Sequence, residues 1–208
     1  MSSDFERRFG GLRRLYGPLG AQRIFDAHVV VVGIGGVGSW AAEALARSGV
    51  GHLTLVDMDH ISESNTNRQI HALSPSLGQA KTEAMRERIA HINPEAVVDV
   101  VDDFVTPQNW RAIADTAMKV GRPLAVLDAC DQMAAKTAMA AWARAEGQLF
   151  VTVGAAGGKR LAHLVEVADV SQATHDPLLA QLRYRLRREH DAPRQGALGV
   201  IGVFSRES

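Results

Sequence analysis

A glycine-rich turn between an apolar run and an Ala-rich segment is the feature that most constrains how this chain folds. The apolar run, residues 28–33, is typical of a strand buried on both faces. The turn contains Gly33, Gly35, Gly36 and Gly38. Glycines let the backbone turn tightly and approach a phosphate, and a helix that starts there offers N–H groups to an anion. Asp57 ends the next apolar run, where a carboxylate meets a ribose hydroxyl in such units. The pattern predicts a nucleotide-binding strand–turn–helix unit.

Strand-like and helix-like segments alternate through most of the chain. We expect strands at residues 28–33, 52–57, 96–101, 123–129 and 148–154. We expect helices at residues 12–26, 39–47, 78–91 and 132–146, and another that opens at Thr106-Pro107. This alternation implies crossover connections and a parallel sheet. The predicted fold is α/β and Rossmann-like, with a mostly parallel sheet flanked by helices.

The pattern changes after Gly154. Residues 163–170 are typical of a strand that leaves the parallel order, and residues 171–188 predict a basic helix. The arginines of that helix are Arg183, Arg185, Arg187 and Arg188. We therefore expect a nucleotide-binding domain at residues 1–155 and a continuation of it at residues 156–208.

Composition excludes several classes of protein. The 208 residues include 23 basic and 23 acidic side chains, so no strongly basic surface covers the whole molecule. A single cysteine, Cys130, excludes a disulfide framework and a four-cysteine zinc site within one chain. The N-terminus lacks an apolar signal region, and no apolar run is long enough for a membrane helix. We expect a cytoplasmic protein.

Further polar residues near the ends of the predicted strands distinguish two classes of nucleotide. These residues are Asp59, Asn65, Arg68, Lys81 and Asp131. A nicotinamide dinucleotide does not require them. A nucleoside triphosphate needs cations for its phosphates and a carboxylate for Mg²⁺. Because the carboxyl ends of parallel strands meet at one edge of a sheet, these side chains can converge there.

In this order, the glycine turn and the motifs Asp-x-Asp, Asn-x-x-Arg-Gln, Gly-x-x-Lys and Asp-Ala-x-Asp resemble the E1-like (ThiF/MoeB) adenylating superfamily. The resemblance covers residues 8–155. It implies that a substrate carboxylate attacks the α-phosphate of ATP, that pyrophosphate leaves, and that an acyl-adenylate remains. ATP and Mg²⁺ are the implied cofactors.

The resemblance gives each matching residue a role. It implies nucleotide-binding roles for Gly33, Gly35, Gly36, Gly38, Asp57, Asp59 and Asn65, and catalytic roles for Arg14, Arg68, Lys81 and Asp131. Asp57 would bind the ribose, and Asp131 would hold Mg²⁺. Asn65, Arg68 and Lys81 would contact the phosphates and stabilise the charge that develops on the leaving pyrophosphate.

Missing cysteines and several local segments indicate one branch of the superfamily. Members that activate ubiquitin-like or sulfur-carrier proteins commonly carry two CxxC pairs and a transfer cysteine, and this chain has neither. The segments RFGG, RLYG, NTNRQIHAL, DDFVTP and DPLLAQLRYRLRRE resemble the tRNA threonylcarbamoyladenosine dehydratases. This resemblance implies ATP-dependent dehydration of N6-threonylcarbamoyladenosine at position 37 of tRNA. After adenylation, the ureido group of the substrate closes the ring to give cyclic threonylcarbamoyladenosine.

The resemblance also implies partners. tRNA is the substrate, and arginines near the N-terminus and in residues 171–188 are candidates for phosphate contacts. Arg14, or Arg13 in its place, resembles an arginine that reaches into the site of a partner subunit, so we expect a homodimer. A cysteine desulfurase or its sulfur acceptor is a further expected partner. His71 and His163 are candidates, by residue type only, for the base that assists ring closure.

Other interpretations stay open at this point. An E1-like enzyme that adenylates the C-terminus of a sulfur-carrier protein shares the same motifs. A nucleotide-binding scaffold without activity also fits. Family members usually continue for several dozen residues beyond the position of Ser208, and a chain without those residues would lack part of the tRNA site or a membrane-associating tail. A nicotinamide-dependent dehydrogenase fits the glycine turn but not the charged residues that follow it.

Overall fold

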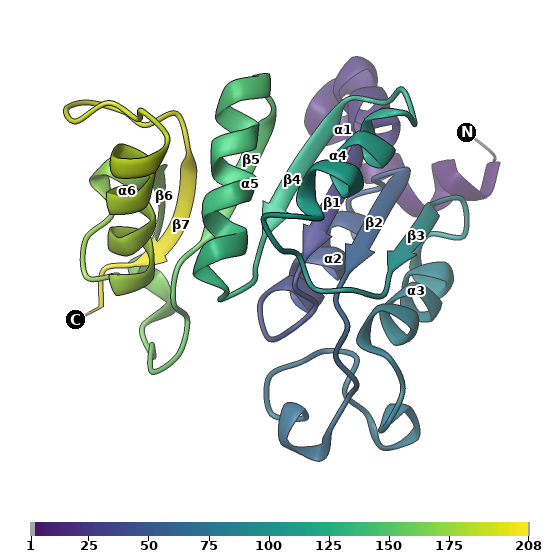
Figure 1. Ribbon diagram of the computed structural model, residues 1–208. Helices are drawn as coiled ribbons and strands as arrows, with labels where there is room; N and C mark the ends of the chain where they lie inside the picture. The colour runs from purple at the N-terminus through teal and green to yellow at the C-terminus, as the bar shows by residue number, and fades with distance from the viewer. Residues whose placement is uncertain (1–2, 208) are drawn as a thin grey trace.

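The computed structural model describes residues 3–207 and contains a seven-stranded sheet with helices on both sides (Figure 1). The strands are β1 (His28–Val32), β2 (His52–Val56), β3 (Val97–Val101), β4 (Leu124–Asp128), β5 (Leu149–Val153), β6 (Val165–Asp169) and β7 (Ile201–Ser205). Their order is β3-β2-β1-β4-β5-β7-β6, and every neighbouring pair is parallel except β6 with β7. The predicted α/β fold with a mostly parallel sheet is confirmed.

Helices cover each face of the central strands. They are α1 (Ser3–Asp26), α2 (Gly38–Arg47), α3 (Lys81–Ile92), α4 (Trp110–Met118), α5 (Met133–Glu146) and α6 (Pro177–Glu189). In β1, Val30 and Val32 join the core formed with α4, α5 and α6, while Val29 and Val31 join the core formed with α2 and α3. Successive strand residues point to opposite faces, so the uninterrupted apolar run is what a strand between two helix layers requires.

Helix α1 is longer than the predicted segment 12–26 and bends in its middle. Gly17 has a φ of 72°, outside the helical range, and Pro18 follows it. Proline disfavours a helical conformation at the residue before it, which accounts for the bend. Phe5 contacts both Phe9 and Phe25, so aromatic packing holds the first part of α1 against the end of the same helix, beyond the bend.

Three helices begin later than the sequence predicts. The expected helix 78–91 begins at Lys81, because Gly78 has a φ of 83° and Ala80 pairs with His60. The helix expected to open at Thr106-Pro107 begins at Trp110. The Thr106 hydroxyl accepts the Asn109 N–H across a turn that precedes that helix.

The basic helix expected at residues 171–188 begins at Pro177. The Asp176 carboxylate accepts the Leu179 N–H there and caps the helix, so residues 171–176 lie outside it. Residues 163–170 do supply a strand outside the parallel order, β6, which pairs antiparallel with β7. β7 itself was not predicted, because Gly196, Gly199 and Gly202 hide its short apolar run. Within residues 3–207, no helix is both long and apolar enough to cross a membrane.

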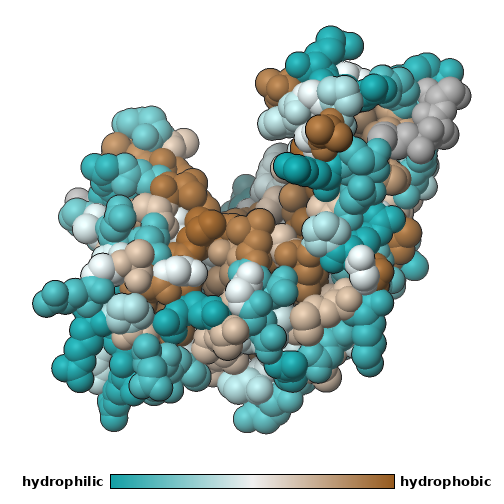
Figure 2. Space-filling view, turned by 90° about the horizontal axis from the view of Figure 1, so that it is seen from above, coloured by the Kyte–Doolittle hydropathy of each residue, from teal (hydrophilic) through white to brown (hydrophobic). Residues whose placement is uncertain are grey.

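The last three strands expose one face of the sheet. α5 and α6 cover the other face, where Phe150 and Phe204 are buried. Leu149, Val165 and Val167 point to the exposed face and are 56%, 52% and 68% exposed. Figure 2 shows hydrophobic residues gathered in a broad hollow on one side of the molecule. A contiguous apolar surface of this kind marks a site of interaction.

Candidate functional site

The glycine turn brings α2 directly against the end of β1. At Gly38, an added Cβ would lie 1.7 Å from the Gly33 carbonyl oxygen, so no larger residue fits. Gly33 has a φ of 85°, and a Cβ there would lie 3.0 Å from the backbone of Ala129. Gly35 has more room, since the nearest atom to an added Cβ is Gln69 Nε2 at 4.0 Å. The outer glycines are thus required by packing, while Gly35 leaves space for a ligand.

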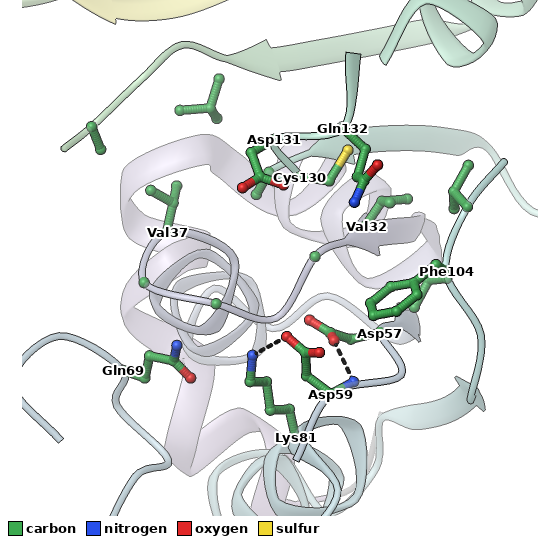
Figure 3. Close-up of a pocket in the computed structure, with 18 of the residues that line it drawn as sticks. Val32, Val37, Asp57, Asp59, Gln69, Lys81, Phe104, Cys130, Asp131 and Gln132 are labelled. Carbon is green, nitrogen blue, oxygen red and sulfur yellow. Dashed lines mark hydrogen bonds and ion pairs between the residues drawn. The ribbon is translucent and has the colours of Figure 1, made fainter. Parts of the chain in front are cut away.

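A cavity of about 840 Å³ opens at the carboxyl ends of the parallel strands (Figure 3). It spans the point between β1 and β4 where the strand order reverses, which is where open α/β sheets bind ligands. The charged residues that line it are Asp57, Asp59, Arg68, Lys81, Asp103 and Asp131. The structure therefore brings together most of the charged residues that the sequence marked as candidates.

Asp57 ties the glycine turn to the end of β2. Its Oδ2 accepts the Ile34 N–H at 2.6 Å, and its Oδ1 accepts the Asp59 N–H at 2.9 Å. The residue is buried but still lines the cavity. Each carboxylate oxygen keeps a further lone pair, so Asp57 can accept a ribose hydroxyl without losing either bond.

Two cationic side chains line the same cavity. The Lys81 ammonium lies 2.6 Å from Asp59 Oδ2, and Lys81 is buried whereas Asp59 is half exposed. Arg68 is exposed, and its guanidinium donates to the Ser64 carbonyl and the Asn67 side chain, each at 3.0 Å. Because these partners lie at the surface, both cations are able to exchange them for phosphate oxygens.

The end of β4 forms the opposite wall. Figure 3 shows Asp131 and Gln132 facing Asp57, Asp59 and Lys81 across the cavity. Asp131 is exposed and makes no hydrogen bond or ion pair with residues 3–207. Its carboxylate is therefore available to a bound cation.

Cys130 lies beside these residues but is a poor nucleophile. Its thiol donates to Asp128 Oδ1 at 3.1 Å. Burial and the neighbouring Asp128 carboxylate raise the pKa of the thiol well above its usual range. Since the thiolate is the reactive form, the structure supports no thioester chemistry at this position.

The charged lining of the cavity is unbalanced. It has four carboxylates, Asp57, Asp59, Asp103 and Asp131, against the cations Arg68 and Lys81. A triphosphate carries several negative charges, so this chain alone offers too little positive charge to hold one. Further positive charge is needed to correct the balance.

Some predicted site residues lie outside the cavity lining. Asn65 is buried, and its side chain accepts the Ser62 N–H at 3.0 Å, so it caps the turn that leads to Arg68. Gly38 lies beneath the glycine turn. Arg14 is exposed on α1, and Arg13 pairs with Glu6 at 3.2 Å.

Neither candidate histidine lines the cavity. His71 is buried at the edge of a second, smaller hollow, and its ring nitrogens make no hydrogen bond with residues 3–207. Burial lowers its pKa to about 4. His163 is exposed in a short turn at residues 162–164. Neither His71 nor His163 is therefore placed to act as a base in this cavity.

The sequence analysis gave several lining residues no role. Gln69 ends the Asn-x-x-Arg-Gln motif but was not named as a site residue; it is buried, and its side-chain oxygen has no partner within the described chain. Residues 153–157 after β5 and Leu178 of α6 form another side of the cavity. Small and apolar residues give no signal of function in a single sequence, so only the fold reveals this side.

Comparison with known proteins agrees with this geometry. Residues 8–197 match the ThiF family. The chain is a member of the ThiF family. This ThiF protein is 49% identical over 210 residues to tRNA threonylcarbamoyladenosine dehydratase of Escherichia coli K12, with 100% of this chain and 76% of the relative covered. It is 43% identical over 206 residues to the Haemophilus influenzae protein of the same name, with 98% and 77% covered.

Solved structures include one of a similar ThiF protein with bound nucleotide. The E. coli dehydratase TcdA, in complex with ATP, superposes on this chain with a TM-score of 0.92 at 50% sequence identity. The match covers 100% of this chain and 84% of that one. TcdA has also been solved in complex with AMP.

Proposed function

We propose that this chain is an ATP-dependent tRNA threonylcarbamoyladenosine dehydratase. It removes one water from N6-threonylcarbamoyladenosine at position 37 of tRNA and gives the cyclic nucleoside. One observation carries the proposal: a chain similar over its whole length to such dehydratases, one of them solved with ATP, holds the charged residues of adenylation around a single cavity.

The reaction has two steps. The carboxylate of the threonyl group attacks the α-phosphorus of ATP, and the bond to pyrophosphate breaks. The ureido nitrogen of the same side chain then attacks the acyl carbon and loses its proton, and AMP leaves with one oxygen of the former carboxylate. Because the substrate supplies its own nucleophile, proximity replaces an enzyme thiol. The unreactive Cys130 is consistent with this chemistry.

The residues around the cavity have different roles in binding ATP and in stabilising the leaving pyrophosphate. Asp57 accepts a ribose hydroxyl, and the N-terminal end of α2 faces the α-phosphate. Arg68 and Lys81 bind the outer phosphates and stabilise the charge on pyrophosphate as it leaves. Asn65 acts on Arg68 through the backbone, since its carbonyl accepts the Arg68 N–H at 3.1 Å.

Asp131 is the residue that we propose for Mg²⁺. Within residues 3–207, no group of three or more His, Cys, Asp or Glu side chains is arranged to hold a metal alone. Mg²⁺ commonly binds one or two carboxylates together with substrate phosphates, and the unpaired Asp131 carboxylate fits that requirement. When bound, the ion neutralises phosphate charge that this cavity cannot neutralise by itself.

We also propose a homodimer. The exposed apolar face formed by β5, β7 and β6 supports it, together with the exposed side chains of Leu15 and Leu19 on α1, which are 71% and 78% exposed. Burying such surfaces against a second copy removes apolar area from water. The charge imbalance supports it independently, because Arg14 or Arg13 of the second copy would add a cation near the phosphates.

The activity is tested by mass analysis of nucleosides. tRNA that carries threonylcarbamoyladenosine is incubated with the chain, ATP and Mg²⁺ and then digested under mild conditions that keep the ring closed. The proposal predicts a nucleoside lighter by one water, formed only with ATP. If the mass does not change although ATP binds, dehydration is not the function. ATP–pyrophosphate exchange that depends on a small carrier protein would then favour the sulfur-carrier alternative.

A further inference from the structure

The cavity has two ends of different chemistry. The glycine turn, Asp57 and Lys81 form a polar end at β1 and β2. Residues 153–157 and Leu178 form the other end, and none of their side chains is charged. A nucleotide in an open α/β sheet occupies the crevice between β1 and β4. The β5 end lies beyond that crevice and is free for a second, less charged molecule.

Hydrogen bonds to one carboxylate join the β5 end of the cavity to the start of α6. The Asp176 carboxylate is buried and accepts the N–H groups of Ala155 and Leu179, both at 2.9 Å. A Cβ at Gly154 would lie 2.0 Å from Asp176 Oδ2, so only glycine permits this contact. At Gly157, by contrast, an added Cβ meets no atom within 4 Å. The wall is therefore fixed at its base and open at Gly157.

Two cations follow this wall directly in the chain. Lys159 donates to the carbonyl oxygens of His175 and Glu207, which hold its ammonium group beside the loop. The Arg160 side chain is 89% exposed, and its Nε lies 3.9 Å from the Glu207 carboxylate. Arg160 and Leu161 also donate backbone N–H groups to that carboxylate. A tethered loop thus presents an almost free guanidinium next to an uncharged wall.

The arginines of α6 are less suited to contact a molecule in this cavity. Arg183 donates to the carbonyl oxygens of Val170 and Ala173, and Arg187 donates to that of Pro193. These bonds give both side chains a structural role. Leu178, at the start of α6, lines the cavity, and the helix places its last arginines, Arg187 and Arg188, about 14–15 Å further along its axis. In Figure 1 the loop after β5 lies at the cavity end of α6, opposite the loop that follows this helix.

We propose that residues 153–157 and Leu178 hold the modified nucleoside, and that Arg160 binds phosphates of the adjoining nucleotides in a single-stranded RNA loop. The inference rests on the proposed function. In this arrangement the uncharged wall recognises the modified base together with its side chain, and the cation binds the RNA backbone. Contacts to the backbone position RNA without reading its sequence.

Charge reversal at Arg160 tests the phosphate contact. Arg160→Glu is compared with Arg194→Glu, an exposed arginine in the loop after α6. We expect the KM for tRNA to rise about tenfold in Arg160→Glu, with a weaker salt dependence of tRNA binding, and to change little in Arg194→Glu. The KM for ATP should stay unchanged in both. An unchanged KM for tRNA in Arg160→Glu, or an equal rise in both variants, would overturn the inference.

Filling the open wall tests the nucleoside pocket. Gly157→Leu places a side chain where a Cβ meets no neighbour, so the fold should persist. We expect ATP to bind with wild-type affinity and turnover of tRNA to fall strongly, with a smaller loss in Gly157→Ala. Full turnover in Gly157→Leu would contradict a pocket at this end.

The two proposals fail in different ways. If the wild-type chain binds tRNA but does not dehydrate it, the proposed function fails, and the effect of Arg160→Glu on tRNA affinity still decides the inference. If the wild-type chain dehydrates tRNA and Arg160→Glu binds it equally well, the inference alone fails.

Discussion

The Lys136 ammonium lies 2.8 Å from Asp128 Oδ2, and both side chains are fully buried. The Thr152 hydroxyl donates to the same carboxylate oxygen at 2.6 Å, and Lys136 donates to Thr152 at 3.0 Å. Asp128 Oδ1 accepts the Cys130 N–H at 3.2 Å. This network joins α5, β4 and β5 immediately beneath the turn that carries Asp131. It holds the wall of the cavity from which Asp131 projects.

Removing the charge of Lys136 should destabilise the fold. Lys136→Met leaves the Asp128 carboxylate buried without its partner, which costs about 3–5 kcal/mol for comparable pairs. Urea unfolding monitored by circular dichroism measures the loss. The double variant Lys136→Met with Asp128→Leu should recover part of it, because no uncompensated charge remains. A single variant as stable as the wild type would show that the pair is not energetically coupled.

Substitutions at two glycines of the turn should have different effects, one on the stability of the fold and the other on ATP binding. Gly38→Ala forces a Cβ against the Gly33 carbonyl oxygen, so we expect α2 to shift and the protein to unfold at lower temperature. Gly35→Ala meets only Gln69 Nε2 at 4.0 Å, so its stability should be close to that of the wild type. Its methyl group points into the space for phosphate, and ATP affinity should fall about tenfold or more. Calorimetric titration with ATP checks this contrast, and equal ATP affinity in Gly35→Ala and the wild type would contradict it.

The central fold follows from sequence because each signal is local. The run of valines in β1, the glycine turn and Asp57 each depend on spacing within a few tens of residues. β7 did not follow, because three glycines interrupt its surroundings and its place between β5 and β6 is set by long-range pairing. The start of α6 was misplaced because Pro177 and its cap Asp176 are stronger start signals than the apolar spacing around them.

The charged half of the site was also predictable, and the uncharged half was not. Asp57, Lys81 and Asp131 carry charge at the ends of predicted strands or at the start of a helix, which is a chemical signal in one sequence. Residues 153–157 are small and apolar, and their place in the cavity depends on the Asp176 contact twenty residues away. Lys136 carried no signal either, since a lysine in a predicted helix is ordinarily at the surface.

Acid should destabilise the protein in a window set by buried histidines. Burial, with Lys81 and Arg88 nearby, lowers the pKa of His71 from 6.5 to about 4, and burial does the same for His28. In the unfolded chain these histidines bind protons below pH 6.5, whereas in the folded chain they stay neutral until about pH 4. Stability from each group is therefore complete above pH 6.5 and is lost as the pH falls toward 4, up to about 3 kcal/mol for His71.

The variant His71→Leu tests this titration. Urea unfolding between pH 4 and 6.5 should show a weaker pH dependence than in the wild type, with the contribution of His28 remaining. His163→Leu is the matched control, because it removes an exposed histidine and leaves the buried ones in place. An equal slope in His71→Leu and the wild type would show that His71 titrates alike in the folded and unfolded chains.

Mixing two inactive variants should reveal a shared active site. Arg14→Ala and Asp131→Ala should each lose most turnover, for different reasons. If Arg14 acts in the site of the partner subunit, mixed dimers contain one site with both residues intact, and about a quarter of wild-type activity returns. Steady-state turnover after refolding the mixture measures it. If Arg14→Ala is inactive and no activity returns although mixed dimers form, the arginine acts within its own subunit; repeating the mixture with Arg13→Ala tests its neighbour.

The path of one oxygen atom tests carboxylate adenylation most directly. tRNA is prepared with a heavy-oxygen label in the threonyl carboxylate and incubated with the chain, ATP and Mg²⁺. Attack of that carboxylate on the α-phosphorus, followed by ring closure, predicts one labelled oxygen in the AMP released and none in pyrophosphate. Cyclic product formed with unlabelled AMP would contradict the account, because the carboxylate would then have been activated without forming an acyl-adenylate.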